Sequence, residues 1–361
     1  MSIEALARPD IVAMRPYSSA RKEAPGQGVL LNANEAPWSL LEGSDWEARL
    51  NRYPEPQPAD LVERLAGLYG VTAEQVLVTR GSDEGIDLLT RVFCRAGQDA
   101  ILQSPPTFGM YRIAAQAQGA GIVSVARSEA DGFRLQEQDL IAALETDERI
   151  RLVFLTSPNN PTGDVVDRGF LEQLLDRAHD RAVVVIDEAY AEFCHQPSAA
   201  DLVSGYPNLV VLRTLSKAWA AAGLRCGVVL AQPALLALLR RIIAPYPLPS
   251  PVTALALRML RDDMLEKQHH MLQQLAANKQ SLLAMLDERP FIEAIIPGHA
   301  NFVLLRTRQA AALLAFCAER GVILRGFPAD PLLQCYVRIS VGSTQDIDAL
   351  AAVLDQWEKT S

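Results

Sequence analysis

The sequence has no long, uncharged hydrophobic run. Its most apolar extended stretch, residues 224–244, is interrupted by Arg225, Arg240 and Arg241, whereas a helix that spans a membrane needs about 20 predominantly apolar residues. The first ten residues, MSIEALARPD, also lack the basic and then apolar pattern of a secretion signal. We therefore expect no membrane partner and a cytoplasmic location.

Basic charge is scarce as well. The 361 residues include 34 lysines and arginines against 43 aspartates and glutamates, so the formal net charge at pH 7 is -9. A protein that binds a nucleic-acid backbone needs concentrated Lys and Arg to neutralise the phosphates. The composition thus argues against nucleic acid as a partner.

Cysteine and histidine are rare, with five of each. No two cysteines have the two-residue spacing of a metal or redox motif, and most lie in apolar runs, where a free thiol behaves as a small hydrophobic group. The histidines have no cysteine or carboxylate companions at ligand spacing. We expect reduced thiols and no metal site.

What the sequence does contain is an alternation of short apolar runs with amphipathic helical stretches. The runs that predict strands are residues 76–79, 99–103, 152–156, 182–187 and 209–213. Such continuous apolar strands are typical of a mainly parallel sheet that helices cover on both faces, an α/β fold. Ligands of such sheets bind beyond the carboxyl ends of the strands.

A proline at every second position from Pro245 to Pro251 makes this stretch extended and stiff. We place a domain boundary there, with a large domain at residues 41–250 and a smaller α+β domain at residues 251–361. In the smaller domain we expect a long helical stretch at 253–287 and strands near 301–305, 321–324 and 336–341. Residues 1–40 have little periodicity, so we expect an arm that packs with the small domain or a partner subunit.

Two segments predict turns that bind a ligand at the edge of the sheet. In residues 80–87, the backbone N–H groups of Gly81, Ser82 and Asp83 lie between a strand and a helix, where they can bind an anion. In residues 157–163, SPNNPTG, a rigid turn can direct an asparagine amide towards the same edge. Taken alone, the first segment favours an ordinary strand-to-helix turn with a capping residue, and the alternative for the second is a plain turn.

Two more segments add charged groups. Asp187 ends an apolar strand, and a buried carboxylate needs a partner, so it either caps a helix or pairs with a cationic ring. Lys217 stands among small apolar residues with Arg225 eight positions later, and desolvation beside a cation lowers the pKa of an amine. The alternative for Lys217 is a solvated surface position.

The combination of an anion site, an amide, a carboxylate, a phenol, an amine and a guanidinium suits pyridoxal 5′-phosphate (PLP). From Ser216 to Arg225 the sequence matches the pattern S-K-x-aromatic-x-x-small-G-x-R without a gap. In this pattern, and in its spacing over nearly the whole chain, the sequence resembles the fold-type-I PLP-dependent aminotransferases. The resemblance implies the fold of that class, with a large PLP-binding domain.

The resemblance also implies roles for individual residues. Lys217 would bind the cofactor covalently and move the proton between the substrate Cα and C4′, and Asp187 would keep the ring nitrogen protonated. Phe108 would stack on the ring, at a position where the family often has tyrosine, and Tyr111 is a nearby alternative. The remaining cofactor contacts would be Asn160 and Tyr190 to the ring 3′-oxygen, and the backbone of Gly81, Ser82 and Asp83 with Ser216 and Arg225 to the phosphate. Tyr190, with Lys217 and Asp187, would belong to the catalytic set.

Five further segments resemble the histidinol-phosphate aminotransferases. They are RPYSSAR at 15–21, LNANEAP at 31–37, NRYPEP at 51–56, APYPLP at 244–249 and VRISVGS at 337–343. The resemblance implies transfer of an amino group between L-histidinol phosphate and 2-oxoglutarate, giving imidazole acetol phosphate and glutamate in two alternating half-reactions. It also implies a homodimer in which Tyr53 reaches the cofactor phosphate of the neighbouring subunit.

In that reaction Arg338 would bind the α-carboxylate of glutamate, because its planar fork matches a planar carboxylate. Arg338 with Arg325 would bind the phosphate of histidinol phosphate. For Arg325, a surface arginine at the end of a strand is an equally good interpretation. Tyr17 and Asn34 are further candidates for substrate binding, or residues that simply pack against a partner.

Three other functions fit the same motifs. An aromatic amino-acid aminotransferase would prefer phenylalanine or tyrosine as amino donor, and a decarboxylase acting on threonine phosphate would release carbon dioxide. A regulator or scaffold that binds PLP without turnover is disfavoured, since Lys217, Asp187, Asn160 and Arg225 are all present.

Overall fold

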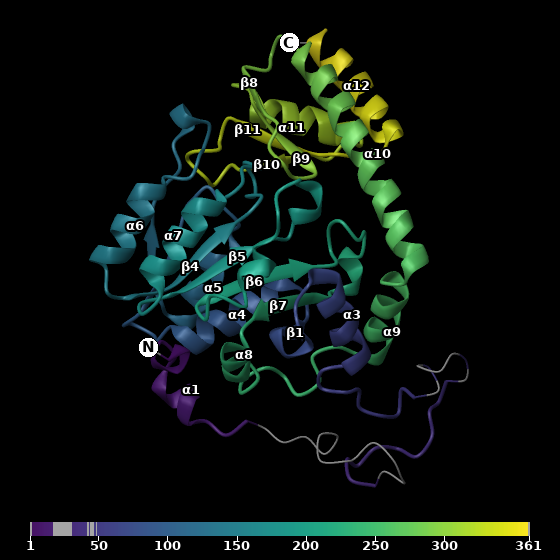
Figure 1. Ribbon diagram of the computed structural model, residues 1–361. Helices are drawn as coiled ribbons and strands as arrows, with labels where there is room; N and C mark the ends of the chain where they lie inside the picture. The colour runs from purple at the N-terminus through teal and green to yellow at the C-terminus, as the bar shows by residue number, and fades with distance from the viewer. Residues whose placement is uncertain (1, 17–30, 42, 44–46, 48, 360–361) are drawn as a thin grey trace.

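The computed structural model describes residues 2–16, 31–41, 43, 47 and 49–359, which form two sheets with their covering helices (Figure 1). The larger sheet has seven strands and the smaller has four. Among the predicted site residues, only Tyr17 lies outside the described residues.

The large sheet is mainly parallel, as the sequence predicts. Its strand order is β1-β7-β6-β5-β4-β2-β3, and β7 runs antiparallel to both β1 and β6 while the other pairs are parallel. The strands are β1 (Val76–Thr79), β2 (Ala100–Gln103), β3 (Gly121–Ser124), β4 (Ile150–Thr156), β5 (Val183–Asp187), β6 (Leu209–Thr214) and β7 (Gly227–Ala231).

Helices cover both faces of this sheet, which explains why its strands are apolar throughout. Along β5, Val184 and Ile186 pack into one core cluster while Val183 and Val185 pack into the other. On the first face lie α3 (Ala59–Tyr69), α6 (Glu137–Thr146), α7 (Arg168–Ala178) and α9 (Ser250–Met259). On the second face lie α1 (Pro9–Ala13), α4 (Ser82–Phe93), α5 (Met110–Gln118) and α8 (Pro233–Leu239).

The beginning of the expected arm packs on the large sheet's helices. Ile3 and Ile11 are buried in the second core cluster, and the backbone N–H of Arg8 donates to the Val92 carbonyl at 2.9 Å. The sequence did not indicate this contact, because the apolar residues before position 14 are too few to show a period.

The small sheet is antiparallel, in the order β10-β11-β9-β8. Its strands are β8 (Ala294–Ile296), β9 (Phe302–Arg306), β10 (Arg325–Gly326) and β11 (Tyr336–Ser340), and they pack with α10 (Asp262–Asp287), α11 (Ala310–Glu319) and α12 (Thr344–Glu358). In Figure 1, α10 runs from α9 beside the large sheet up to the small sheet.

Three details differ from the expectation for this part of the chain, and the first is that β8 was not predicted. The single helical stretch predicted at 253–287 is two helices, α9 and α10, separated at Leu260 and Arg261. The strand predicted at 321–324 begins later, at Arg325, where pairing with β11 starts; Gly321 and Val322 still belong to the turn that ends α11, in which the Val322 N–H donates to the Cys317 carbonyl.

The two sheets meet at a contact between glycines. Gly163 follows β4 and Gly298 precedes β9; a Cβ on Gly163 would lie 2.7 Å from the Gly298 Cα. Beside it, the His299 N–H donates to the Gly163 carbonyl at 2.6 Å. The Lys279 ammonium on α10 donates to the carbonyls of Gly298 and Ala300, each at 2.8 Å. The backbone of the small sheet is thus tied to the turn that carries Asn160.

Candidate functional site

The polar residues predicted at the ends of the strands converge on one pocket, a cavity of about 100 Å³. Most of the residues predicted to bind a cofactor line it: Ser82, Asp83, Phe108, Asn160, Asp187, Tyr190, Ser216, Lys217 and Arg225. Thr156, Ala189 and Thr214 also line it and were not predicted. They stand at or just beyond the ends of β4, β5 and β6, so their position in the strand pattern was the available signal.

One wall of the pocket is the start of α4, where backbone N–H groups are free to bind an anion. Gly81 precedes the helix with φ +77°, and a Cβ there would lie 2.5 Å from an Arg225 guanidinium nitrogen. A Cβ on Gly227 would lie 2.6 Å from the Ser82 nitrogen. The positive φ favours glycine at position 81, and the approach of the β7 backbone to the start of this helix requires glycine at position 227.

Arg225 connects the residues around this anion site. Its guanidinium donates to Ser216 Oγ at 3.2 Å and to the Asp83 carboxylate at 3.1 Å. An anion bound here would compete with the Asp83 carboxylate for Arg225, so the contribution expected from Asp83 to anion binding is its backbone N–H.

Asp187, at the end of β5, is 2% exposed. Its Oδ1 accepts the Ala189 N–H at 3.1 Å, and its Oδ2 accepts the phenol of Tyr111 at 2.8 Å. Burial raises the pKa of Asp187 to about 6, an effect that these two hydrogen bonds partly oppose. Within the described residues no ion pair of Asp187 with Lys, Arg or His is found.

The aromatic residues Phe108 and Tyr111 have separate places. Phe108 lines the pocket, as predicted for the stacking residue, whereas Tyr111 is fully buried in α5 behind it. The two rings meet edge to face, with centroids 5.7 Å apart. The hydrogen bond from Tyr111 to Asp187 was missed, because the sequence alone does not fix which face of α5 turns towards β5.

Asn160 links the pocket to the small sheet, because it hydrogen-bonds both Tyr190 and Arg338. The Asn160 amide donates to the Tyr190 hydroxyl at 3.3 Å, and the Asn160 Oδ1 accepts from Arg338 of β11. Arg338 lies over the ring of Phe302 at 5.2 Å, and its Nε is buried without a partner among the described residues. The structure thus brings one predicted substrate residue to the cofactor pocket.

Lys217 faces the pocket with its Nζ 5.8 Å from the centre of the Tyr190 ring. Partial burial lowers the pKa of the Lys217 amine, and the cations Arg338 and Arg225 lower it further. This is the direction that the sequence predicts, and it raises the share of neutral amine that can act as a nucleophile or base.

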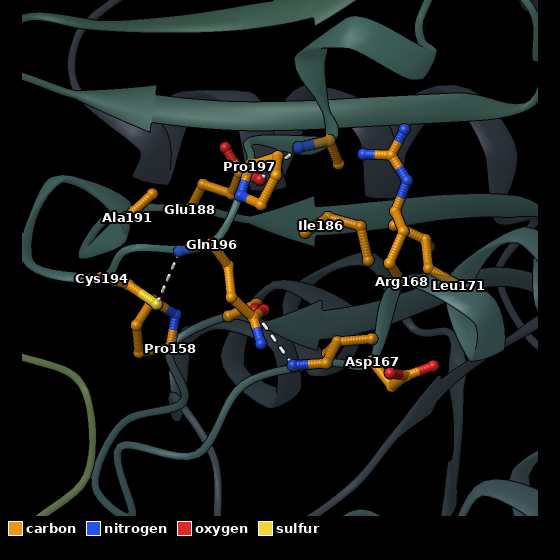
Figure 2. Close-up of a pocket in the computed structure, with 13 residues that line it drawn as sticks. Pro158, Asp167, Arg168, Leu171, Ile186, Glu188, Ala191, Cys194, Gln196 and Pro197 are labelled. Carbon is orange, nitrogen blue, oxygen red and sulfur yellow. Dashed lines mark hydrogen bonds between the residues drawn. The ribbon is translucent and has the colours of Figure 1, made fainter.

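The side chain of Glu188, the residue after Asp187, points to the other face of the sheet. Glu188 accepts from Arg213 at 2.7 Å and from the Ala199 N–H at 2.7 Å. Arg213 also donates to Glu192 at 2.7 Å and lies 4.7 Å from the centre of the Tyr69 ring. Figure 2 shows Ile186 and Glu188 among the side chains that line a separate hollow of about 200 Å³ on this face.

The other predicted substrate residues, and Tyr53, which was predicted to reach the cofactor of the neighbouring subunit, are not gathered in the pocket. Arg325 lies opposite Arg338 in the pairing of β10 with β11, but its side chain is exposed. Tyr53 is 48% exposed, stacks on Tyr246 with ring centroids 4.6 Å apart, and shares a different hollow with Asn34. Tyr17 lies outside the described residues.

The pocket fits PLP by the chemistry of its donors. An anion site with a cation and a hydroxyl can hold the phosphate, a flat aromatic side chain can cover the ring, and a buried carboxylate can face the ring nitrogen. Lys217 supplies the amine, and it lies near the Asn160 and Tyr190 pair that can bind the ring oxygen. Among the described residues, no group of three or more His, Cys, Asp or Glu is arranged to hold a metal ion.

Comparison with known proteins agrees with this chemistry. Residues 40–354 match the family described as aminotransferase class I and II. The chain belongs to this family, whose members use PLP.

Within the family, the chain is 45% identical to the histidinol-phosphate aminotransferase of Aeromonas hydrophila over 98% of each chain. It is 44% identical to that of Cronobacter sakazakii over 97% of each chain. The histidinol-phosphate aminotransferases are therefore the branch of the family to which it belongs. A solved histidinol-phosphate aminotransferase from Sinorhizobium meliloti, in complex with PLP, superposes with a TM-score of 0.76 at 21% identity, covering 98% of this chain and 88% of that one.

No helix of the described part of the chain is both long and apolar enough to cross a lipid bilayer.

Proposed function

We propose that this chain transfers the amino group between L-histidinol phosphate and 2-oxoglutarate, giving imidazole acetol phosphate and glutamate. The observation that carries the proposal is the hydrogen bond from Arg338 to Asn160, which joins an anion-binding arginine to the cofactor pocket. A phosphate or carboxylate bound by Arg338 would thus lie beside the reacting centre, as both half-reactions require.

Each cofactor contact has a residue to supply it. Arg225, Ser216 and the N–H groups at the start of α4 would hold the phosphate through charge-assisted hydrogen bonds. Phe108 would cover the ring, and the Asp187 carboxylate would accept a hydrogen bond from the protonated ring nitrogen. PLP bound here supplies a ring that accepts electrons from the substrate Cα.

Lys217 is the residue that we assign to proton transfer. Its amine, with a lowered pKa, would take the proton from the substrate Cα and return one to C4′. Tyr190 and Asn160 would bind the ring 3′-oxygen. Arg338 would hold the carboxylate of glutamate and, with Arg325, the phosphate of histidinol phosphate. Asn34 and Tyr17 remain candidates from the N-terminal region.

We further propose that the enzyme is a homodimer with shared active sites. Large apolar side chains in the segment 31–53 are exposed, with Leu31 at 89%, Trp38 at 80% and Leu40 at 100%. Such a patch is costly in water and is typical of an interface. Tyr53 is in the same segment, so a partner that covers this patch would bring its own Tyr53 towards a cofactor phosphate.

The oligomeric state can be measured by sedimentation velocity. We expect the mass of two chains for the parent protein and a shift towards one chain for Leu40→Glu, because a buried charge opposes association. A parent protein that sediments as a single chain at micromolar concentration would contradict the dimer.

The division into an arm at 1–40, a large domain at 41–250 and a small domain at 251–361 also stays a prediction. So does the cytoplasmic location, which the five free cysteines support, since thiols stay reduced in that compartment.

The function is tested by titrating PLP-loaded protein with amino donors while the cofactor absorbance is recorded. L-Histidinol phosphate should react at a concentration at least about tenfold lower than phenylalanine, since only the first offers a phosphate to Arg338. Glutamate should react as the second donor. Lys217→Ala, the control, should bind PLP more weakly and react with none of them.

Other outcomes point to other functions. Preference for phenylalanine would replace the proposal with an aromatic amino-acid aminotransferase, and release of carbon dioxide from threonine phosphate would replace it with a decarboxylase. Full turnover by Lys217→Ala would remove Lys217 from the catalytic set.

A further inference from the structure

Tyr111 is a buried phenol next to the pocket that the proposed roles leave unused. Its ring stacks on Phe154 with centroids 4.7 Å apart and an interplanar angle of 8°, and it meets Phe108 edge to face. The residue has no exposed surface. Packing on both sides therefore fixes the position of the hydroxyl.

That hydroxyl lies between two oxygens, Asp187 Oδ2 at 2.8 Å and Thr156 Oγ1 at 2.7 Å. Burial and the Asp187 charge raise the pKa of Tyr111 well above its usual value, so the phenol keeps its proton. An ionised carboxylate can only accept, so the phenol donates to Asp187 and accepts the Thr156 hydroxyl. The order of donation is Thr156 to Tyr111 to Asp187.

The carboxylate of Asp187 consequently has one donor on each oxygen, the Ala189 N–H on Oδ1 and the Tyr111 phenol on Oδ2. The charges of Asp83 and Glu188 oppose its ionisation. Tyr111 is the only side chain among the described residues that hydrogen-bonds Asp187. A hydrogen bond to the charged form favours that form.

We infer that Tyr111 is a positioning residue that keeps Asp187 ionised and orients its carboxylate towards the ring nitrogen of PLP. The inference rests on the proposed role of Asp187. Tyr111 itself does not line the cofactor pocket, and of the two hydrogen-bond partners of its hydroxyl, Asp187 is the one proposed to meet the ring nitrogen. Its effect should therefore depend on the presence of a ring nitrogen in the bound molecule.

This dependence gives a sharp test. Cofactor-free parent protein and Tyr111→Phe are titrated with PLP and with a PLP analogue in which a C–H group replaces the ring nitrogen. The variant removes one hydroxyl and keeps the aromatic stacking on Phe154. The measured quantity is the ratio of the two dissociation constants, read from the absorbance of the bound ligand.

We expect the parent to bind PLP more tightly than the analogue. In Tyr111→Phe this preference should fall by about tenfold, a loss mainly of PLP affinity, as for a charge-assisted hydrogen bond. Binding of the analogue should change little, because the analogue has no ring nitrogen for Asp187 to meet.

Tyr336→Phe is the matched control. The Tyr336 hydroxyl is likewise buried and donates to a carboxylate, Glu129, at 2.9 Å, but it does not contact the cofactor pocket. The control should lose a similar amount of thermal stability and keep the parental preference for PLP.

The possible failures are distinguishable. If Tyr111→Phe weakens both ligands equally, or changes neither, the residue only supports the packing and the inference is overturned. If the parent protein itself shows no preference for PLP, then Asp187 does not bind the ring nitrogen. That result overturns both the proposed role of Asp187 and the inference for Tyr111, but not the role of Lys217.

Discussion

Asp187 and Glu188 are consecutive buried carboxylates at the end of β5, and their surroundings are opposite. Glu188 faces the side of the sheet where Arg213 and the Ala199 N–H hold it, with Ser198 as a third donor. Asp187 faces the pocket, where a phenol and one backbone N–H are its only hydrogen-bond donors within the described part of the chain. Successive side chains of a strand point to opposite faces, which explains how one strand end places a carboxylate on each face of the sheet.

The two carboxylates differ in whether the chain itself supplies a cationic partner. A buried carboxylate is costly unless it is paired, and Glu188 is paired within the chain by the Arg213 guanidinium. Asp187 has hydrogen bonds but no cationic partner among the described residues. A protonated ring nitrogen would supply the missing cation, so this side of the strand end is organised for a bound molecule.

The largest effect should come from breaking the internal pair. Arg213→Met keeps an apolar chain of similar length but leaves Glu188 and Glu192 without their shared cation. We expect the free energy of unfolding to fall by about 3–5 kcal/mol, measured by urea denaturation of the cofactor-free protein. PLP affinity of the folded variant should stay within about threefold of the parent, a difference of about 0.7 kcal/mol.

An unchanged unfolding free energy would contradict the role of this pair. A large loss of PLP affinity at full stability would show instead that the two faces of β5 are not independent.

A smaller effect is expected for Asp187 and concerns the affinity for PLP. In the free protein, Asp187 has its pKa raised to about 6, so below that pH it must release a proton before it can accept a hydrogen bond from the protonated ring nitrogen. PLP affinity should therefore fall by up to about tenfold per pH unit as the pH drops below 6. The measurement is a set of PLP titrations from pH 8 to pH 5.

Asp187→Asn isolates this contribution, because Lys217 and the PLP phosphate titrate in both proteins. The variant should bind PLP about a hundredfold more weakly at pH 8 and show a shallower pH profile below 6. In the cofactor-free protein, burial favours the protonated form of Asp187 over the ionised form. The free energy of unfolding should therefore fall as the pH rises from about 4 to 6 and Asp187 ionises. Asp187→Asn without PLP should thus be more stable than the parent above pH 6, and parallel pH profiles would contradict this account.

The smallest effect is expected at a less buried counterpart of Arg213. Arg168 also bridges two carboxylates, those of Asp201 and Glu172, but 38% of its side chain is exposed, against 7% for Arg213. Arg168→Met should change the unfolding free energy by less than about 1 kcal/mol. A loss as large as that of Arg213→Met would show that burial is not what separates the two arginines.

The parts of the molecule that could be predicted from the sequence are those with local signals. The apolar runs predicted five of the seven strands of the large sheet, β1, β2, β4, β5 and β6, since a strand covered on both faces is apolar along its length. Asp187, Asn160 and Lys217 were predicted to share an edge because each follows such a strand. Their shared pocket agrees with that prediction, while their roles await the titrations above.

The parts that could not be predicted depend on contacts between distant segments. The hydrogen bond from Tyr111 to Asp187 joins residues 76 positions apart and depends on the rotation of α5 about its axis. The division of 253–287 into α9 and α10 depends on how each helix packs, since both keep a helical period. Neither feature leaves a pattern within a window of a few residues.

The contact of Gly163 with Gly298 has a consequence for substrate length. Main-chain atoms have no rotamers, so the close approach of these glycines and the hydrogen bond from His299 fix the separation between the turn that carries Asn160 and the strand that carries Arg338. The two proposed substrates carry their anionic groups at different distances from the reacting amine. That difference has to be taken up by the Arg338 side chain and by the substrates themselves, because the backbone at this contact holds the two elements at one separation.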